Sequence, residues 1–351
     1  MKKFDLNRLI RPNIQKLQPY RSARDDFDSG ILLDANENSF GSLVPSELEL
    51  HRYPDPYQNK LRKMVAGFRE VKPEQVFMGS GSDEAIDLLI RAVCEPGKDS
   101  ILITPPTYGM YKVSAGINDN AVISVPLTPA FQLRTEAIFN EVTDATKIIF
   151  LCSPNNPTAN LLNQDDILEI VERFDGLVVV DEAYIDFSEQ PSYAGRVSEY
   201  PNLVVLQTLS KAFGMAGARL GIAIASEEVI NVILKIKAPY NINKLTAQAG
   251  LQALERLDEM KATVHKIYKE KCRLISEFGT FKDIRKVFPS DANFILIQVV
   301  NAKELYRKLA ANGVIVRYRG DQIHCEETLR VTVGTRDEND ALLHNLRQII
   351  S

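Results

Sequence analysis

One pattern recurs along the first two thirds of the chain and constrains its fold more than any other feature. A short run rich in β-branched residues ends in a cluster of Gly, Pro or Ser, and a helical pattern follows. The runs are nearly continuous in apolar residues rather than alternating, which is typical of strands covered on both faces in a mostly parallel sheet. Seven such runs occur, at 76–78, 101–104, 121–125, 147–152, 177–180, 203–207 and 220–225. The pattern therefore predicts one large α/β domain.

The pattern of apolar and charged residues changes after Pro239. Two helical stretches follow, and the second, at 255–278, is long and charged. Short strand patterns at 293–297, 314–319 and 329–333 then alternate with helical patterns at 303–312 and 337–350, which predicts a smaller α+β domain. Because a chain of 351 residues exceeds what one hydrophobic core usually serves, we divide it into three parts. These are an N-terminal arm at 1–30, a large domain at 31–255 and a small C-terminal domain at 256–351.

Charge and composition narrow the class of partner. With 42 Lys and Arg against 46 Asp and Glu, the chain shows no electrostatic footprint for nucleic acid or an anionic membrane. It has no apolar segment of the length of a secretory signal or a membrane span. Its four cysteines are far apart and form no CxxC pair, which argues against a disulfide framework and a structural zinc site. We predict a cytoplasmic protein without a metal that binds small molecules and copies of itself.

A loop rich in small residues follows the run at 203–207. It reads TLSKAFGMAGARLG over 208–221, and its small residues allow a ligand to approach the backbone closely. Thr208, Ser210, Lys211 and Arg219 offer donors suited to a phosphate. The alternative interpretation is a glycine-rich loop with a solvated lysine.

Polar residues end two other predicted strands. Asp181 closes the buried run VVVD, at the edge where α/β sheets bind ligands, and an acid there is costly unless it meets a cation. Asn156 lies in the segment SPNNPT at 153–158, which also fits a plain turn.

A third motif, GSGSDE at 79–84, leads from a predicted strand into an amphipathic helix. A helix start of this kind binds anions, although Asp83 and Glu84 equally suit a first helical turn. Glu84 stands where a dinucleotide fingerprint needs Gly or Ala, and the chain has no G-x-x-x-x-G-K-[ST] motif. NAD and P-loop nucleotides are therefore not indicated.

These motifs, in this order, resemble those of the fold-type I pyridoxal-phosphate aminotransferases. The segments LDANEN (33–38), RYPD (52–55), GSDE (81–84) and RVTVGT (330–335) are similar to the histidinol-phosphate aminotransferase family, and the resemblance covers nearly the whole chain. It implies a mostly parallel seven-stranded sheet with a smaller α+β domain. It also implies pyridoxal 5'-phosphate as cofactor and, in histidine biosynthesis, the conversion of histidinol phosphate and 2-oxoglutarate to imidazole-acetol phosphate and glutamate.

The resemblance implies a role for each motif residue toward the cofactor. Lys211 would form the Schiff base, Asp181 would pair with the pyridinium nitrogen, and Tyr184 and Asn156 would hydrogen-bond the phenolic oxygen. The residues implied to hold the cofactor phosphate are Ser82, Asp83, Thr208, Ser210 and Arg219.

Two tyrosines are implied to complete the cofactor site. Tyr108 would stack on the pyridine ring, although an aromatic residue in a loop is more often mere packing. Tyr53 would reach across a two-fold interface to the cofactor phosphate of the partner in a homodimer with shared active sites. The alternative is that Tyr53 only packs in a proline-rich turn.

The substrate contacts are also implied by the resemblance. Arg330 would hold the α-carboxylate of glutamate, and Arg317 and Tyr20 would bind the substrate phosphate. Without the motif, an arginine on a strand is usually part of a surface ion pair. Asn36, Tyr111 and Asn156 are the further residues expected to line the substrate pocket.

The chain departs from the family pattern at the turn that carries Asn156. The family usually reads N-P-N-N-P-T-G, and here Ser153 and Ala159 replace the first Asn and the final Gly. If the last position needs a positive φ, Ala159 costs about 1 kcal/mol of strain, and otherwise the turn differs.

Two rival enzymatic functions remain open, and a third function of a different class is disfavoured. An aromatic amino-acid aminotransferase and a threonine-phosphate decarboxylase would both keep Lys211, Asp181 and Arg219. A transcriptional regulator with an aminotransferase-like domain would need an attached DNA-binding domain, and the roughly thirty residues before Asp34 are too few to form one.

Overall fold

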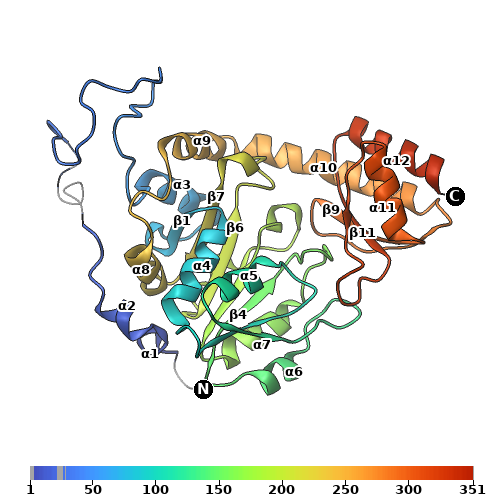
Figure 1. The fold of residues 1–351 in the computed structure, drawn as a ribbon, viewed down its shortest axis with the longest axis horizontal. Coiled ribbons are helices and arrows are strands. Elements are labelled where there is room, and N and C mark those ends of the chain that lie inside the picture. Colours follow the sequence, from blue (N-terminus) through green and yellow to red (C-terminus); the bar gives the residue numbers. More distant parts are fainter. Residues whose placement is uncertain (1–3, 22–26, 28, 351) are drawn as a thin grey trace.

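A sheet of seven strands fills the larger of two bodies, which Figure 1 shows joined by a long helix. The structure is a computed structural model that describes residues 4–21, 27 and 29–350. The strands are β1 (Val76–Ser80), β2 (Ser100–Ile103), β3 (Ala121–Ser124), β4 (Thr146–Cys152), β5 (Leu177–Asp181), β6 (Leu203–Thr208) and β7 (Leu220–Ala225). Their order is β1-β7-β6-β5-β4-β2-β3. All neighbours pair parallel except β7, which is antiparallel to both β1 and β6, so the predicted mostly parallel sheet is confirmed.

The continuous apolar runs arise because both faces of this sheet are buried. In β4, Ile148 and Phe150 belong to one core cluster, while Ile149 and Leu151 belong to the cluster on the opposite face. Helices cover both faces. One face packs α4 (Ser82–Val93), α5 (Met110–Ile117) and α8 (Glu227–Ile236), and the other packs α3 (Asn59–Arg69), α6 (Thr135–Glu141), α7 (Gln164–Arg173) and α9 (Lys244–Leu254). Short 3-10 helices lie at Pro73–Gln75, Ile185–Phe187, Tyr193–Arg196 and Ala216–Ala218.

The smaller body is an antiparallel sheet with helices on one face, and α10 (Leu257–Phe278) leads to it. Its elements are β8 (Ile284–Val287), β9 (Phe294–Val299), α11 (Ala302–Ala311), β10 (Arg317–Tyr318), β11 (Thr328–Thr332) and α12 (Arg336–Ile349), with strand order β10-β11-β9-β8. The apolar pattern at 314–319 forms a strand over two residues only, and β8 has no counterpart among the predicted strands. The predicted boundary between residues 255 and 256 falls between α9 and α10, and the division into domains stays a prediction.

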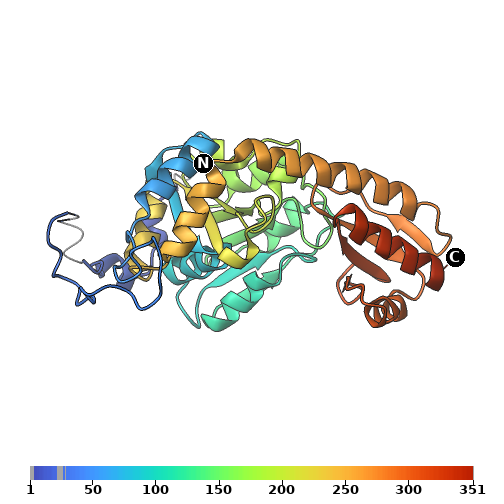
Figure 2. The same ribbon diagram turned by 90° about the horizontal axis from the view of Figure 1, so that it is seen from above.

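The N-terminal segment begins on the large body and then leaves it. Helices α1 (Leu6–Leu9) and α2 (Pro12–Lys16) are tied to it by hydrogen bonds from the Arg11 backbone to Ala92 and from Lys235 to Gln15. The described residues beyond α2 then run along the outside, where Figures 1 and 2 show them projecting from the fold. Their exposed apolar side chains include Tyr20, Phe27, Ile31, Phe40 and Leu43. None of the helices in the described ranges is long and apolar enough to cross a membrane.

Candidate active site

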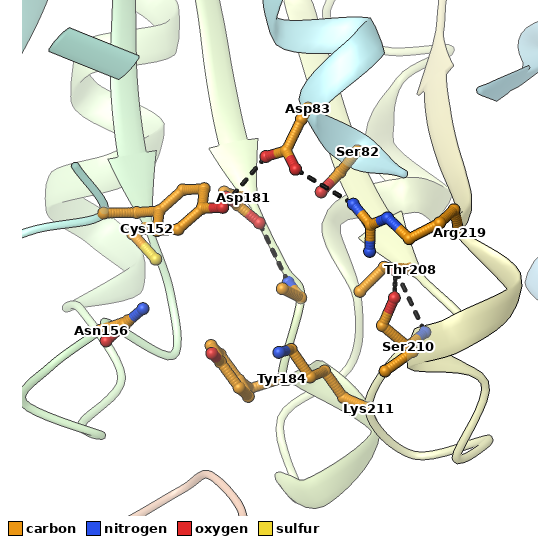
Figure 3. Close-up of a pocket in the computed structure, with 13 residues that line it drawn as sticks. Ser82, Asp83, Cys152, Asn156, Asp181, Tyr184, Thr208, Ser210, Lys211 and Arg219 are labelled. Carbon is orange, nitrogen blue, oxygen red and sulfur yellow. Dashed lines mark hydrogen bonds and ion pairs between the residues drawn. The ribbon is translucent and has the colours of Figure 1, made fainter. Parts of the chain in front are cut away.

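A cavity of about 140 Å³ opens at the carboxyl ends of the central strands, where the sequence motifs meet. Figure 3 shows the side chains that converge on it. Every residue predicted to bind the cofactor lines this cavity except Tyr53. They are Ser82, Asp83, Tyr108, Asn156, Asp181, Tyr184, Thr208, Ser210, Lys211 and Arg219. The sheet topology therefore joins motifs that lie more than a hundred residues apart in sequence.

Lys211 lies in the loop after β6, with its amine directed toward Tyr184. The Lys211 Nζ atom is 5.5 Å from the centre of the Tyr184 ring. Burial lowers the pKa of Lys211, and the positive charge of Arg330 lowers it further. Both effects favour the neutral amine, which is the nucleophilic form.

Asp181 ends β5 at the floor of the cavity, where its side chain is buried. Its Oδ2 accepts a hydrogen bond of 2.6 Å from the Tyr111 hydroxyl, and its Oδ1 accepts one of 3.1 Å from the Ala183 backbone. Burial raises the pKa of Asp181 to about 6, although these hydrogen bonds and the charge of Lys211 act in the opposite direction. A buried carboxylate of this kind is stabilised by a cationic group on a ligand.

Tyr111 corrects one sequence-based expectation. We predicted that it lines the substrate pocket, but its side chain is completely buried behind Asp181 and stacks on Phe150 with ring centres 4.7 Å apart. Burial raises the pKa of Tyr111, so its hydroxyl stays protonated and remains a donor to Asp181. No sequence pattern predicts this contact, because Tyr111 and Asp181 are far apart along the chain and come together only when α5 packs on the sheet.

The opposite end of the cavity has the donors that an anion requires. Helix α4 begins at Ser82, and the Cβ of a side chain added at Gly221 would lie 2.1 Å from the Ser82 nitrogen, so the backbones of β7 and α4 approach closely here. The Thr208 hydroxyl donates to Ser210 Oγ over 2.9 Å, and Arg219 lies 3.2 Å from Asp83 Oδ2. Hydroxyl groups, a guanidinium and a helix N-terminus together suit a phosphate monoester.

Tyr108 lies between these two ends of the cavity. Its hydroxyl donates to Asp83 Oδ1 over 3.0 Å, and its ring meets the edge of Tyr111. The cavity thus combines an amine, an acid and an anion site around an aromatic side chain. This set of groups fits pyridoxal phosphate, which has an aldehyde, a basic ring nitrogen and a phosphate.

The smaller body contributes Arg330 from β11. Its Nη1 donates to Asn156 Oδ1 over 2.5 Å, and its guanidinium carbon lies 5.3 Å from the centre of the Phe294 ring. Phe294 in turn meets the edge of Tyr184, with ring centres 5.0 Å apart. Arg317 is the direct cross-strand neighbour of Arg330. Two predicted substrate residues therefore lie on one strand pair beside the cavity.

The turn that carries Asn156 is held by both bodies. Ala159 has a φ of 67° and is fully buried, so the position does require the left-handed conformation that the family's glycine would adopt freely. In the smaller body, the Asp291 backbone donates to the Ala159 carbonyl over 2.7 Å, and Asp291 Oδ2 accepts from the Leu161 backbone over 3.0 Å. No sequence pattern pointed to Asp291, because its partners lie about 130 residues away along the chain.

Three further predicted residues lie outside the cavity of this chain, in the N-terminal segment formed by the described residues before α3. Tyr20 and Asn36 are exposed, and Tyr53 stacks on Tyr240 with ring centres 4.5 Å apart. Neighbouring Arg52 pairs with Glu37 over 2.7 Å. A single chain does not bring these three side chains to the site, so their roles stay predictions.

Comparison with known proteins gives one consistent result. A family model described as aminotransferase class I and II matches residues 28–346. The chain is 51% identical over 346 residues to a histidinol-phosphate aminotransferase of Cytophaga hutchinsonii, with 98% of this chain and 99% of the relative covered. The crystal structure of the histidinol-phosphate aminotransferase from Clostridium acetobutylicum superposes with a TM-score of 0.79 at 25% identity, covering 86% of this chain and 91% of that one. The enzyme from Sinorhizobium meliloti, solved in complex with pyridoxal 5'-phosphate, has the same fold, with a TM-score of 0.77 at 21% identity and 96% and 97% of the chains covered.

Proposed function

Because this chain belongs to the histidinol-phosphate aminotransferases, within the class I and II aminotransferase family, we propose that it moves the amino group of histidinol phosphate to 2-oxoglutarate by means of Lys211. It is a pyridoxal-phosphate-dependent transaminase of histidine biosynthesis. The observation that carries the residue assignment is the convergence of Lys211, Asp181 and the anion donors of α4 in one cavity, with Arg330 at its side.

Pyridoxal phosphate, when bound, supplies the carbonyl that receives the amino group and a ring that takes up the electron pair left on the substrate carbon. Asp181 would hold a proton on the ring nitrogen, and Tyr111 would keep its carboxylate oriented. Lys211 Nζ would take the proton from the substrate α-carbon, for which its lowered pKa suits it. Ser82, Ser210 and Arg219 would hold the phosphate.

The first experiment replaces Lys211 by Ala. We expect the loss of steady turnover and of the cofactor adduct that borohydride traps on the wild-type chain. The Lys211→Ala protein should still retain some cofactor, because Asp181 and the phosphate donors remain. Wild-type turnover by this variant would contradict the assignment of Lys211.

The substrate is tested separately from the catalytic residue. Single-turnover spectra of the wild-type enzyme are recorded with histidinol phosphate, phenylalanine and threonine phosphate in parallel, and released CO2 is measured. We expect histidinol phosphate to convert the cofactor to its amino form fastest, without CO2. A faster reaction with phenylalanine would favour an aromatic aminotransferase, and CO2 from threonine phosphate would favour a decarboxylase.

We further propose a homodimer with shared active sites, working in the cytoplasm. What supports the dimer is the N-terminal segment, whose described residues expose Ile31, Phe40 and Leu43 to more than nine tenths. A surface segment that exposes several large apolar side chains together often marks a contact with another chain. Tyr20, Asn36 and Tyr53 belong to this segment, so the partner subunit is the one whose cavity they would complete.

Mixing two inactive variants tests this arrangement. Tyr53→Ala chains and Lys211→Ala chains are combined under conditions that allow subunit exchange. About half of the dimers would then be mixed, and each would contain one site with both residues intact. Activity should rise to about a quarter of the wild-type value. If the subunits exchange but activity does not recover, Tyr53 either acts in the active site of its own subunit or has no role in catalysis.

A further inference from the structure

The small sheet places three arginines on one face. Arg317 in β10 is directly opposite Arg330 in β11, and the next pair is Tyr318 with Leu329. The Arg319 backbone continues this ladder by donating to the Thr328 carbonyl over 3.0 Å. Because side chains alternate across a strand, Arg319 points to the same face as Arg317.

This arginine face is directed toward the large body. The opposite face, with Leu329 and Val331, packs in the core of the small body beneath α11 and α12. On the arginine face, Leu296 of β9 joins the core of the large body, and Arg330 reaches Asn156. The three guanidinium groups therefore lie on the side of the small sheet that borders the cavity.

The positive charges on this face are not paired with carboxylates among the described residues. Like charges directly opposite each other on neighbouring strands are destabilising. In the described part of the chain, none of the three arginines forms an ion pair, and the Nε of Arg319 is buried without a hydrogen-bond partner. Burial lowers the pKa of Arg319, and the charges of Arg330 and then Arg317 lower it further, while the charge of Asp321 acts in the opposite direction. An anionic ligand would supply the charge and the acceptor that this face lacks.

We propose that Arg319 is a specificity residue of the substrate site, binding together with Arg317 and Arg330 the phosphate of the amino substrate. This inference rests on the proposed function. A carboxylate has one charge and two oxygens, which one guanidinium can satisfy in a bidentate pair. A phosphate monoester at neutral pH has close to two charges and three free oxygens, so it uses more than one arginine. Arg319 therefore favours a phosphorylated amine over glutamate.

The test measures binding of both amino substrates to the holoenzyme. Dissociation constants for histidinol phosphate and glutamate come from the spectral change of the first half-reaction, alongside its limiting rate. We expect Arg319→Gln to weaken histidinol phosphate about 10- to 100-fold, the range for one lost hydrogen bond between charged groups, with little change in the limiting rate. Glutamate should weaken less than about threefold, and Arg319→Lys should recover part of the loss.

A matched control and the possible outcomes keep the test decisive. Arg285 is exposed on β8 of the same small sheet, so Arg285→Gln removes an equal charge and should leave both constants unchanged. Wild-type affinity in Arg319→Gln, or equal losses for the two substrates, would overturn the inference. Failure of the wild-type enzyme to convert histidinol phosphate would instead overturn the proposed function. If Arg319→Gln does not fold, Arg319→Lys still tests the preference, because it keeps the charge but not the bidentate geometry.

Discussion

Replacing Asp181 by Asn should change how the stability of the cofactor-free protein depends on pH. Burial raises the pKa of this carboxyl group from its ordinary 3.8 to about 6. A group with a raised folded-state pKa contributes stability that is fully present below its unfolded-state pKa and is lost as the pH rises through the folded-state value. At about 1.4 kcal/mol for each pH unit, the difference between the two values corresponds to about 3 kcal/mol. The wild-type protein should lose this amount between about pH 4 and pH 7, because an uncompensated charge then forms in the core.

Urea unfolding of both cofactor-free proteins across this pH range isolates the contribution. The asparagine variant cannot ionise, so the difference in the free energy of unfolding should grow with pH in favour of the variant. Asp258→Asn is the control, because that carboxylate is fully exposed on α10 and its loss should leave the pH dependence unchanged. If the free energies of unfolding of the wild type and Asp181→Asn changed in parallel with pH, the argument that ionising this buried carboxyl group destabilises the cofactor-free protein would be refuted. In the holoenzyme the order should reverse, since the variant would bind the cofactor more weakly.

Substitutions at three further positions test contacts that hold the site in place. Tyr111→Phe removes the hydroxyl that donates to Asp181, and it should weaken cofactor retention about tenfold, measured by equilibrium dialysis. Ala159→Gly relieves the strain of a positive φ, but it also loses a buried methyl group and gives the unfolded chain more conformational freedom, so the free energy of unfolding should stay within about 1 kcal/mol of the wild-type value. Ala159→Val should lower the free energy of unfolding by more than about 2 kcal/mol, because a β-branched residue is strained at this φ. Lys271→Met removes the two hydrogen bonds from the buried amine to the carbonyls beside Asp291. It should raise the KM for the amino substrate severalfold and change the affinity for the cofactor less. Equal changes in KM and in cofactor affinity would contradict a role confined to the small body.

The sequence predicted the seven-stranded sheet well because burial on both faces leaves a signal in every strand. β8 lacks that signal, since Arg285 and Lys286 are exposed at its centre and interrupt the apolar run. Most of the cavity was equally predictable, because the carboxyl ends of parallel strands meet at one edge of a sheet. Tyr111 and Asp291 were not, because their partners are set by how distant segments pack. Arg319 is an intermediate case: the spacing from Arg317 was visible in the sequence, but the register against β11 was needed to show that they share a face with Arg330.

The turn around Asn156 connects substrate recognition with the cofactor site. Asn156 lines the cavity and accepts a hydrogen bond from Arg330, while Asp291 holds the same turn through its backbone and its carboxylate. Lys271 fixes the carbonyls on either side of Asp291 and so supports the segment through which the small body holds the turn. A substrate anion that binds to the arginine face would compete with Asn156 for the Arg330 guanidinium, while Asp291 would still hold the turn from the side of the small body. Without that hydrogen bond the Asn156 side chain would be free to turn toward the cofactor ring, and its contact there would depend on whether the arginine face is occupied.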